Sequence, residues 1–323
     1  DSNHLAIAYM ADSSVLHFIV FYSTDAGNSW VKSNFDSKAT YDSLFTIQPL
    51  HFGDPVLTFD HIGTLHLTYI YGRKMLHVYS TDGGANFLPP TLNKHELNVD
   101  TLQGEFLYRQ WMASDVSGGA FNGNSYVCAT SFEPPLGTGK DSTVVYIKPA
   151  DSLGFNKART IVLGHNSGTY ALFNNIEVDH NGAVHISFMR FNNSSLQGDI
   201  LYAKSIDGGQ TFSPPSIISS GTTSLNGQNN VIHDRDNAAV SMVVDKSNVY
   251  ISWSDYANST VRSYYVYSHD GGANFSAPIE FGPLAVSGNF YHIMPNVAAQ
   301  NGNMALSWYL VDSTSKLSSY VVA

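Results

Sequence analysis

A turn signature of eight residues recurs four times along the 323-residue chain and constrains its fold more than any other feature. The copies read S-x-D-[AG]-G-x-x-[WF] and lie at residues 23–30, 80–87, 205–212 and 268–275. An Asp side chain can accept hydrogen bonds from the N–H groups of a tight turn, and glycines can adopt the positive φ that such a turn requires. We therefore interpret each octet as a hairpin turn whose final aromatic residue packs back between strands.

The spacing of the octets predicts one further, decayed copy. Successive octets begin 57, 125 and 63 residues apart, so the middle interval is about two periods. Residues 144–155 (VVYIKPADSLGF) parallel residues 200–212 (ILYAKSIDGGQTF) and keep the turn aspartate. The turn aspartates are therefore expected to be Asp25, Asp82, Asp151, Asp207 and Asp270.

Short strand-forming segments repeat in the same order ahead of each turn. In the second unit they are 54–60, 64–70 and 74–80, separated by turn residues. Four short strands between turn signals form one blade of a β-propeller. We predict a single all-β domain over residues 1–323, a six-bladed β-propeller of four-stranded antiparallel blades with Asp-box turns. Both terminal blades are incomplete, which leaves room for additional domains or surface partners.

Charge and composition exclude several functional classes. The formal net charge is −10 with only 16 Lys and Arg residues, which argues against nucleic acid and against an anionic membrane surface as partners. No apolar stretch approaches the ~20 residues of a membrane span, so no membrane insertion is expected. The single cysteine, Cys128, lies in an apolar run and is interpreted as a buried core thiol.

The face of the propeller opposite the octets is the expected ligand face. Loops between strands 2 and 3, and connections from strand 4 to the next strand 1, lie there. Guanidinium groups bind carboxylates and sulfates through paired hydrogen bonds, which favours an anionic ligand. The alternative is that the arginines on this face pair with neighbouring aspartates and hold loops together. Five of the six arginines fall on this face, namely Arg73, Arg109, Arg190, Arg235 and Arg262.

The HDRD segment at residues 233–236 combines both signs of charge. It is interpreted as a structural ion-pair cluster or as a calcium-binding loop with Asp234 and Asp236 as ligands. Calcium is the one cofactor that the sequence suggests, and none is required.

The octets and the blade pattern resemble the sialidase (BNR-repeat, Asp-box) superfamily over essentially the whole chain. That superfamily includes sialidases, other glycosidases, polysaccharide lyases and non-catalytic binding proteins, so fold alone does not give the activity. The stretch NNIEVDHNGAVHISFMR resembles the one that carries the second substrate-binding arginine of sialidases, which implies that role for Arg190. Likewise VRSYYVYSHDGG implies the third arginine at Arg262, and Tyr291 is placed like the nucleophile.

The chain also departs from the sialidase pattern. The motif of the first arginine is absent, and Glu177 lies too late in its strand to be the Glu that relays to the nucleophile. Asp36, Asp42 and Asp54 are weak candidates for the acid. A neutral Tyr with a pKa of ~10 is a poor nucleophile without that Glu.

Three functions follow from these residues. The first is an extracellular or cell-surface propeller that binds a glycan or another surface polymer, with an anionic ligand, without turnover. The second is a retaining exo-α-sialidase. The third is a polysaccharide lyase, for which Tyr108 with Arg109, or Tyr291 with His292, supply the residue types. Arginines that converge over a Tyr–carboxylate pair would favour an enzyme, and arginines tied to carboxylates would favour binding.

Overall fold

The computed structural model is all-β in the part of the chain that it describes. Every regular element there is a strand, and each strand pairs antiparallel with its neighbours. The described residues are 3–11, 17–35, 52–71, 74–88, 106–132, 141–152, 154–155, 159–163, 169–192, 194–195, 197–223, 240–257, 260–282, 290–312, 314–315 and 318–323.

These strands form six sheets, each built from strands that follow one another in the chain. The first two sheets have three strands each: β1 (Leu5–Ala11), β2 (His17–Ser23), β3 (Val31–Lys32), and then β4 (Phe52–Phe59), β5 (Leu65–Tyr71), β6 (Lys74–Ser80). The third and fourth have four strands each: β7 (Phe106–Ser114), β8 (Ser125–Phe132), β9 (Asp141–Lys148), β10 (Arg159–Leu163), and then β11 (Thr169–Val178), β12 (Val184–Asn192), β13 (Gln197–Ser205), β14 (Ser216–Thr223).

The fifth sheet again has four strands, and the sixth has three. They are β15 (Ser241–Asp245), β16 (Asn248–Ala257), β17 (Thr260–Ser268), β18 (Ile279–Phe281), and then β19 (Phe290–Gln300), β20 (Asn303–Asp312), β21 (Ser318–Val322). The expected segments 54–60, 64–70 and 74–80 overlap β4, β5 and β6, and the first two differ from the observed strands by a residue or more at their ends. The first, second and last sheets each have three described strands, so the expected incomplete blade at each end stays a prediction.

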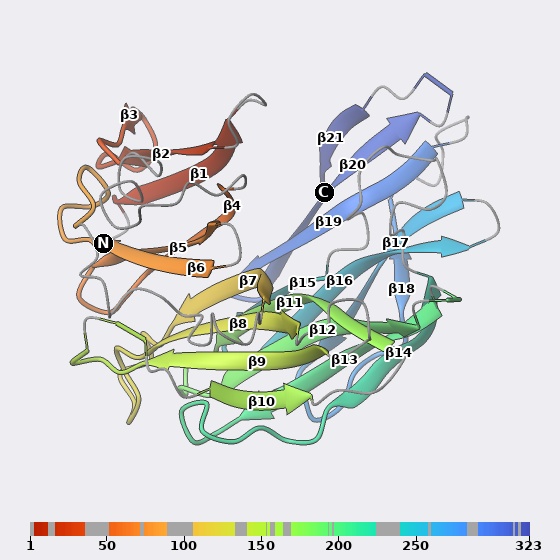
Figure 1. The fold of residues 1–323 in the computed structure, drawn as a ribbon. Coiled ribbons are helices and arrows are strands. Elements are labelled where there is room, and N and C mark those ends of the chain that lie inside the picture. The colour runs from red at the N-terminus through yellow and green to blue at the C-terminus, as the bar shows by residue number, and fades with distance from the viewer. Residues whose placement is uncertain are drawn as a thin grey trace.

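Each sheet packs face to face against the next one along the chain. The first strand of each later sheet, β4, β7, β11, β15 or β19, contacts the preceding sheet. Figure 1 shows this succession, from the red strands β1–β3 through the green strands β11–β14 to the blue strands β19–β21. Because the middle sheets are covered on both sides, strands such as β8 and β12 are buried along nearly their whole length, including the polar residues His185 and Ser187 of β12.

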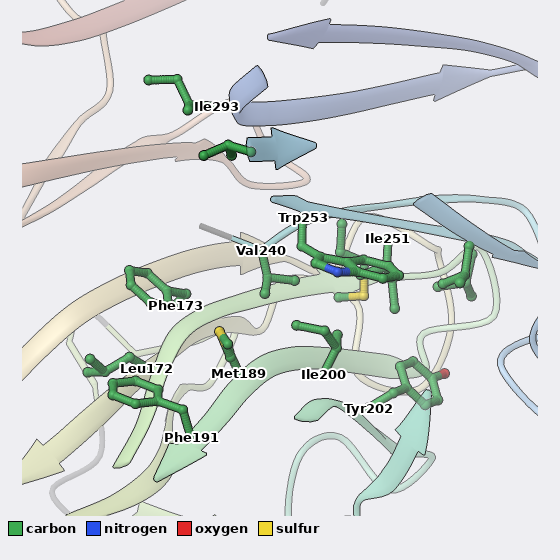
Figure 2. Close-up of a cluster of buried hydrophobic side chains, with 14 of the residues drawn as sticks. Leu172, Phe173, Met189, Phe191, Ile200, Tyr202, Val240, Ile251, Trp253 and Ile293 are labelled. Atoms are coloured by element: carbon green, nitrogen blue, oxygen red, sulfur yellow. The ribbon is translucent and has the colours of Figure 1, made fainter. Parts of the chain in front are cut away.

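The hydrophobic core is divided among the junctions between sheets. One buried cluster lies between each of the first three pairs of neighbouring sheets. A larger cluster joins the fourth, fifth and sixth sheets around Trp253, whose side chain is almost fully buried (Figure 2). A further cluster around Trp308 seals the junction of the last two sheets. The packed faces of the sheets therefore hold the fold together. A ligand site is to be sought at the strand ends and loops.

The four octets form the same hydrogen-bonded turn. In each, the Ser hydroxyl donates to the Asp carboxylate at 2.7–2.8 Å and accepts the N–H of the residue four positions on at 2.8–2.9 Å. The Asp carboxylate also accepts the N–H four residues after it at 2.8–2.9 Å. At the decayed copy, the Ser152 hydroxyl donates to the Gly154 carbonyl at 2.7 Å. The hydroxyl of the next residue, Ser152, therefore organises the turn beside Asp151.

A buried Asp–His–Tyr chain links the fourth sheet to the octet of the fifth. His185 Nε2 lies 3.2 Å from Asp179 Oδ2, and His185 Nδ1 lies 2.6 Å from the Tyr202 hydroxyl. Because a carboxylate only accepts, Nε2 carries the proton and Nδ1 accepts from Tyr202. Burial opposes ionisation of Asp179, but hydrogen bonds from His185 and the Ala183 N–H hold its pKa at about 2. Burial also lowers the pKa of His185.

The second sheet repeats this arrangement. His66 Nε2 lies 3.1 Å from Asp60 Oδ2, and His66 Nδ1 lies 3.0 Å from His77 Nε2. Against the effect of burial, hydrogen bonds from His66 and the Thr64 N–H hold the pKa of Asp60 at about 2. Both aspartates also accept N–H bonds within their own hairpin. These chains are part of the scaffold, on the side of the sheets where the octets lie.

Candidate functional site

A β-bulge interrupts the first strand of four sheets at the same place. The pairing register shifts between Gly53 and Val56, Tyr108 and Trp111, Leu172 and Asn175, and Ile293 and Asn296. The first residue inside each bulge has a positive φ, between 49° and 61°, although none is glycine. We call these four residues the bulge row: Asp54, Arg109, Phe173 and Met294.

Each residue of the bulge row carries backbone strain. A left-handed residue other than glycine costs ~1–2 kcal/mol, and Asn or Asp tolerates it best. Here an acid, a base, an aromatic and a thioether side chain all adopt it. Bulges near functional sites redirect a side chain out of the regular alternation, and strained residues cluster where function needs a fixed geometry. The repeated bulge therefore marks the candidate site.

Contacts between neighbouring sheets connect the bulge row. The Gln110 side-chain amide donates to the Asp54 carbonyl, which joins the bulges of the second and third sheets. The Arg109 guanidinium carbon lies 5.4 Å from the centre of the Tyr108 ring and 5.7 Å from that of Phe173, which joins the third and fourth. Such distances give a cation–π attraction. Phe173 is itself 4% exposed and belongs to the core cluster that includes Ile293, next to Met294 (Figure 2).

The structure separates Arg109 from the other two described arginines of the predicted ligand face. Arg190 lies on β12, opposite Asp199 on β13, and donates to its carboxylate at 2.9 Å. Arg262 lies on β17, with its Nε 3.6 Å from a Glu280 carboxylate oxygen. Both arginines therefore pair with carboxylates on outer strands, whereas Arg109 lies on an innermost strand.

Several predicted residues lie outside the described part of the chain. They are Arg73, Arg235 and the proposed calcium ligands Asp234 and Asp236, together with Asp36 and Asp42. Their roles stay predictions. Within the described residues, no group of three or more His, Cys, Asp or Glu side chains could hold a metal ion. No helix in that part is long and apolar enough to cross a membrane.

Tyr291 and His292 lie on β19, just ahead of the bulge at Met294. Tyr291 packs, partly buried, against the core cluster of the last three sheets. His292 is almost fully buried and stacks on Trp308, with ring centres 6.1 Å apart. Burial, reinforced by the charge of Arg262, lowers the pKa of His292, so the imidazole is neutral at pH 7.

Two carboxyl groups have raised pKa values in the fourth and fifth sheets. Burial raises the pKa of Glu177 on β11 to about 8, so this side chain holds its proton at neutral pH. Burial also raises the pKa of Asp255, which accepts the Thr223 N–H at 2.8 Å. Raised carboxyl pKa values are common at functional sites and also occur in purely structural ones.

Comparison with known proteins supports the fold. No protein-family model matches the chain, and no curated protein sequence matches it at a significant level. Among solved structures, an ulvan lyase of a new polysaccharide lyase family is similar, with 12% identity and a TM-score of 0.59 over 97% of this chain and 77% of that one. A protein of unknown function from Dyadobacter fermentans has 12% identity and a TM-score of 0.59 over 99% of this chain and 90% of that one.

An α-L-arabinanase from Penicillium chrysogenum, solved with arabinobiose, has 14% identity and a TM-score of 0.53 over 83% of this chain and 79% of that one. At such identities the likeness shows the fold, which is all-β and propeller-like. The sequence-based resemblance pointed to sialidases in particular, whereas these similar structures include a lyase and an arabinanase.

Sequence reasoning missed the bulge row as a set, although it singled out Arg109 and named Asp54 as a weak candidate for the acid. The four bulge residues share no residue type, so no motif reveals them. Three of the four share one signal, a fixed distance: Asp54, Arg109 and Phe173 each precede a hairpin aspartate by six residues, at Asp60, Asp115 and Asp179.

Proposed function

We propose that this chain is a carbohydrate-binding propeller whose ligand is an anionic polysaccharide and whose binding site is the bulge row. The observation that carries the proposal is the Arg109 guanidinium on an innermost strand, between the rings of Tyr108 and Phe173. A guanidinium recognises a carboxylate or sulfate, and the partly exposed Tyr108 ring can pack against the apolar face of a sugar, while Phe173, which is 4% exposed, positions the guanidinium. The chain as a whole carries a net charge of −10, but the positive charge of Arg109 favours anionic over neutral sugars at the bulge row.

The similar structures support the class of ligand. One of the ulvan lyase structures contains a bound saccharide with glucuronic acid and sulfated rhamnose, and the arabinanase structure contains arabinobiose. We also propose the finer features expected from the sequence: six blades, octets that are Asp boxes, an extracellular or cell-surface location, and calcium at Asp234 and Asp236.

Turnover of a uronate polymer by β-elimination is the second candidate. The pairing of Tyr108 with Arg109 favours it, because the guanidinium can neutralise the uronate carboxylate while Tyr108, acting as a phenolate, accepts the proton from C5. The electron pair of the C5–H bond then forms the C4–C5 double bond. The C4–O bond breaks, its electron pair moves to the oxygen of the leaving sugar, and that oxygen takes the proton from Tyr108. Hydrolysis of a sialoside, with Tyr291 as nucleophile and Arg190 and Arg262 on the carboxylate, is the third. It would require both arginines to leave their carboxylate partners.

Calorimetric titration with polygalacturonate and with neutral arabinan tests the binding proposal. We expect the wild-type chain to prefer polygalacturonate, and Arg109→Gln to lose ~10–100-fold in affinity, as for a charged hydrogen bond. Lys246→Gln, an equal change of charge on the exposed β15–β16 hairpin, is the matched control. Equal binding of the two polymers, or equal losses in the two variants, would refute the proposal. Two assays distinguish the forms of turnover. Ultraviolet absorbance of an unsaturated product would indicate β-elimination, and release of the aryl alcohol from an aryl sialoside would indicate hydrolysis.

A further inference from the structure

We infer that the binding site continues outward from Arg109 over the third and fourth sheets, as a platform for a polymer chain several sugar residues long. This inference rests on the proposed function and specifies its ligand. The platform consists of three half-buried rings, which we call the aromatic row: Tyr108, Phe132 and Tyr170.

The aromatic row runs across strand ends of two neighbouring sheets. Tyr108 lies on β7, Phe132 is the last residue of β8, and Tyr170 is near the start of β11. Ring centres are 6.4 Å apart between Tyr108 and Phe132, and 6.2 Å apart between Phe132 and Tyr170. The three residues come from separate strands, so their alignment is a property of the fold and not of a local sequence motif.

The far end of the row rests on a buried ring. Tyr170 stacks on Phe191 of β12, with ring centres 6.0 Å apart and an interplanar angle of 27°. Phe191 is 1% exposed and therefore supports the row from beneath without contacting a ligand. Gly198 pairs with Phe191 across the sheet, and a Cβ there would overlap the Arg190 carbonyl and Phe191 itself. The close approach of β12 and β13 thus fixes Phe191, which in turn fixes Tyr170.

The near end of the row begins at the cation of the proposed site. The Arg109 guanidinium carbon lies 5.4 Å from the centre of the Tyr108 ring, so the cation adjoins the first ring of the row, and successive rings are tilted to one another by 52° and 48°. The ring spacing of 6.2–6.4 Å in the aromatic row is of the order of one sugar residue in a chain. An anionic residue bound at Arg109 would therefore place its neighbours over successive rings. A ligand of one or two residues would leave the outer rings unused.

Titration with size-fractionated oligogalacturonates tests this inference. We expect affinity to rise from the di- to the tetra- and octasaccharide in the wild-type chain. Phe132→Ala should weaken octasaccharide binding ~3–10-fold, the range for one aromatic contact, and leave disaccharide binding unchanged. Phe132→Leu keeps apolar volume without a ring, so it serves if the alanine variant does not fold. Tyr320→Ala, at a 60%-exposed ring on β21, is the matched control.

The outcomes separate this inference from the proposal beneath it. If the wild-type chain binds no oligogalacturonate of any length, the proposed function fails. If it binds through Arg109 with an affinity that does not depend on chain length, or if both Phe132 variants match Tyr320→Ala at every length, the aromatic row is only internal packing. The proposed function then stands while the extended platform is overturned.

Discussion

Replacing Glu177 by Gln should stabilise the protein at neutral and alkaline pH and leave it unchanged in acid. Glu177 lies on β11, four residues beyond Phe173, and pairs in register with His185 on β12. Burial raises the pKa of its carboxyl group from 4.5 to about 8. The folded state therefore keeps a proton that the unfolded chain loses, and folding stability falls as pH rises from 4.5 to 8.

The size of the effect follows from these two pKa values. The difference between 4.5 and about 8 corresponds to a ceiling of ~5 kcal/mol above pH 8. The side chain is only partly buried, and water that reaches it lowers that figure, so we expect ~2 kcal/mol at pH 8. Gln has nearly the same shape and no charge. The variant should therefore gain this amount at pH 8, most of it already at pH 6, and almost nothing at pH 4.

Urea unfolding of both chains at pH 4, 6 and 8, followed by tryptophan fluorescence, measures this difference. Glu280→Gln removes the same charge at a side chain that is 45% exposed and serves as the control for net charge. A stability difference between Glu177→Gln and wild type that is equal at all three pH values would refute the reasoning. So would an identical pH dependence in the Glu280 variant.

Three further predictions concern the scaffold. Ser80→Ala removes a fully buried hydroxyl that donates to Asp82 and accepts the Gly84 N–H, and should cost ~1–2 kcal/mol in urea unfolding. Gly272→Ala puts a Cβ onto the Tyr202 hydroxyl at a φ of +86°, and should lower the melting temperature more than an alanine at Gly302, which has open space around it and a φ of +80°. Asp179→Asn loses a carboxylate whose pKa is held at about 2, and should cost ~2 kcal/mol at pH 7. Because the folded pKa is depressed, the wild-type carboxylate loses that contribution below pH 4, which acid titration of wild-type stability would detect.

The fold could be predicted because its strongest signals are local. A Ser, an Asp and a Gly at fixed spacing make their hydrogen bonds within one turn, so the residues that specify the turn are adjacent in the sequence. The same holds for strands bounded by such turns. At Asp151 the parallel with the other octets suggested an aspartate turn, but loss of the preceding Ser leaves the Ser152 hydroxyl to organise it.

The candidate site could be predicted only in part, because its contacts join distant segments. Arg109 and Phe173 are 64 positions apart, and nothing in either neighbourhood indicates that a guanidinium lies over that ring. Arg190 and Arg262 were singled out by resemblance, and the sequence could not show that Asp199 and Glu280 lie beside them. Ion-pair partners of this kind depend on strand register. A slip of one residue would move the side chains of a strand to the opposite face of the sheet and separate the partners.

The bulge row has a consequence for how such a chain can change over time. Its backbone conformation is the same whether the residue is Asp54, Arg109, Phe173 or Met294, so the main chain and not the side chain defines each position. At Asp54, Arg109 and Met294 a substitution exchanges the chemical group that is presented while the main chain keeps its path, whereas at Phe173, which is 4% exposed, it would disturb the core. Under the proposed function, single mutations at these three positions would change the ligand preference and leave the framework of sheets as it is.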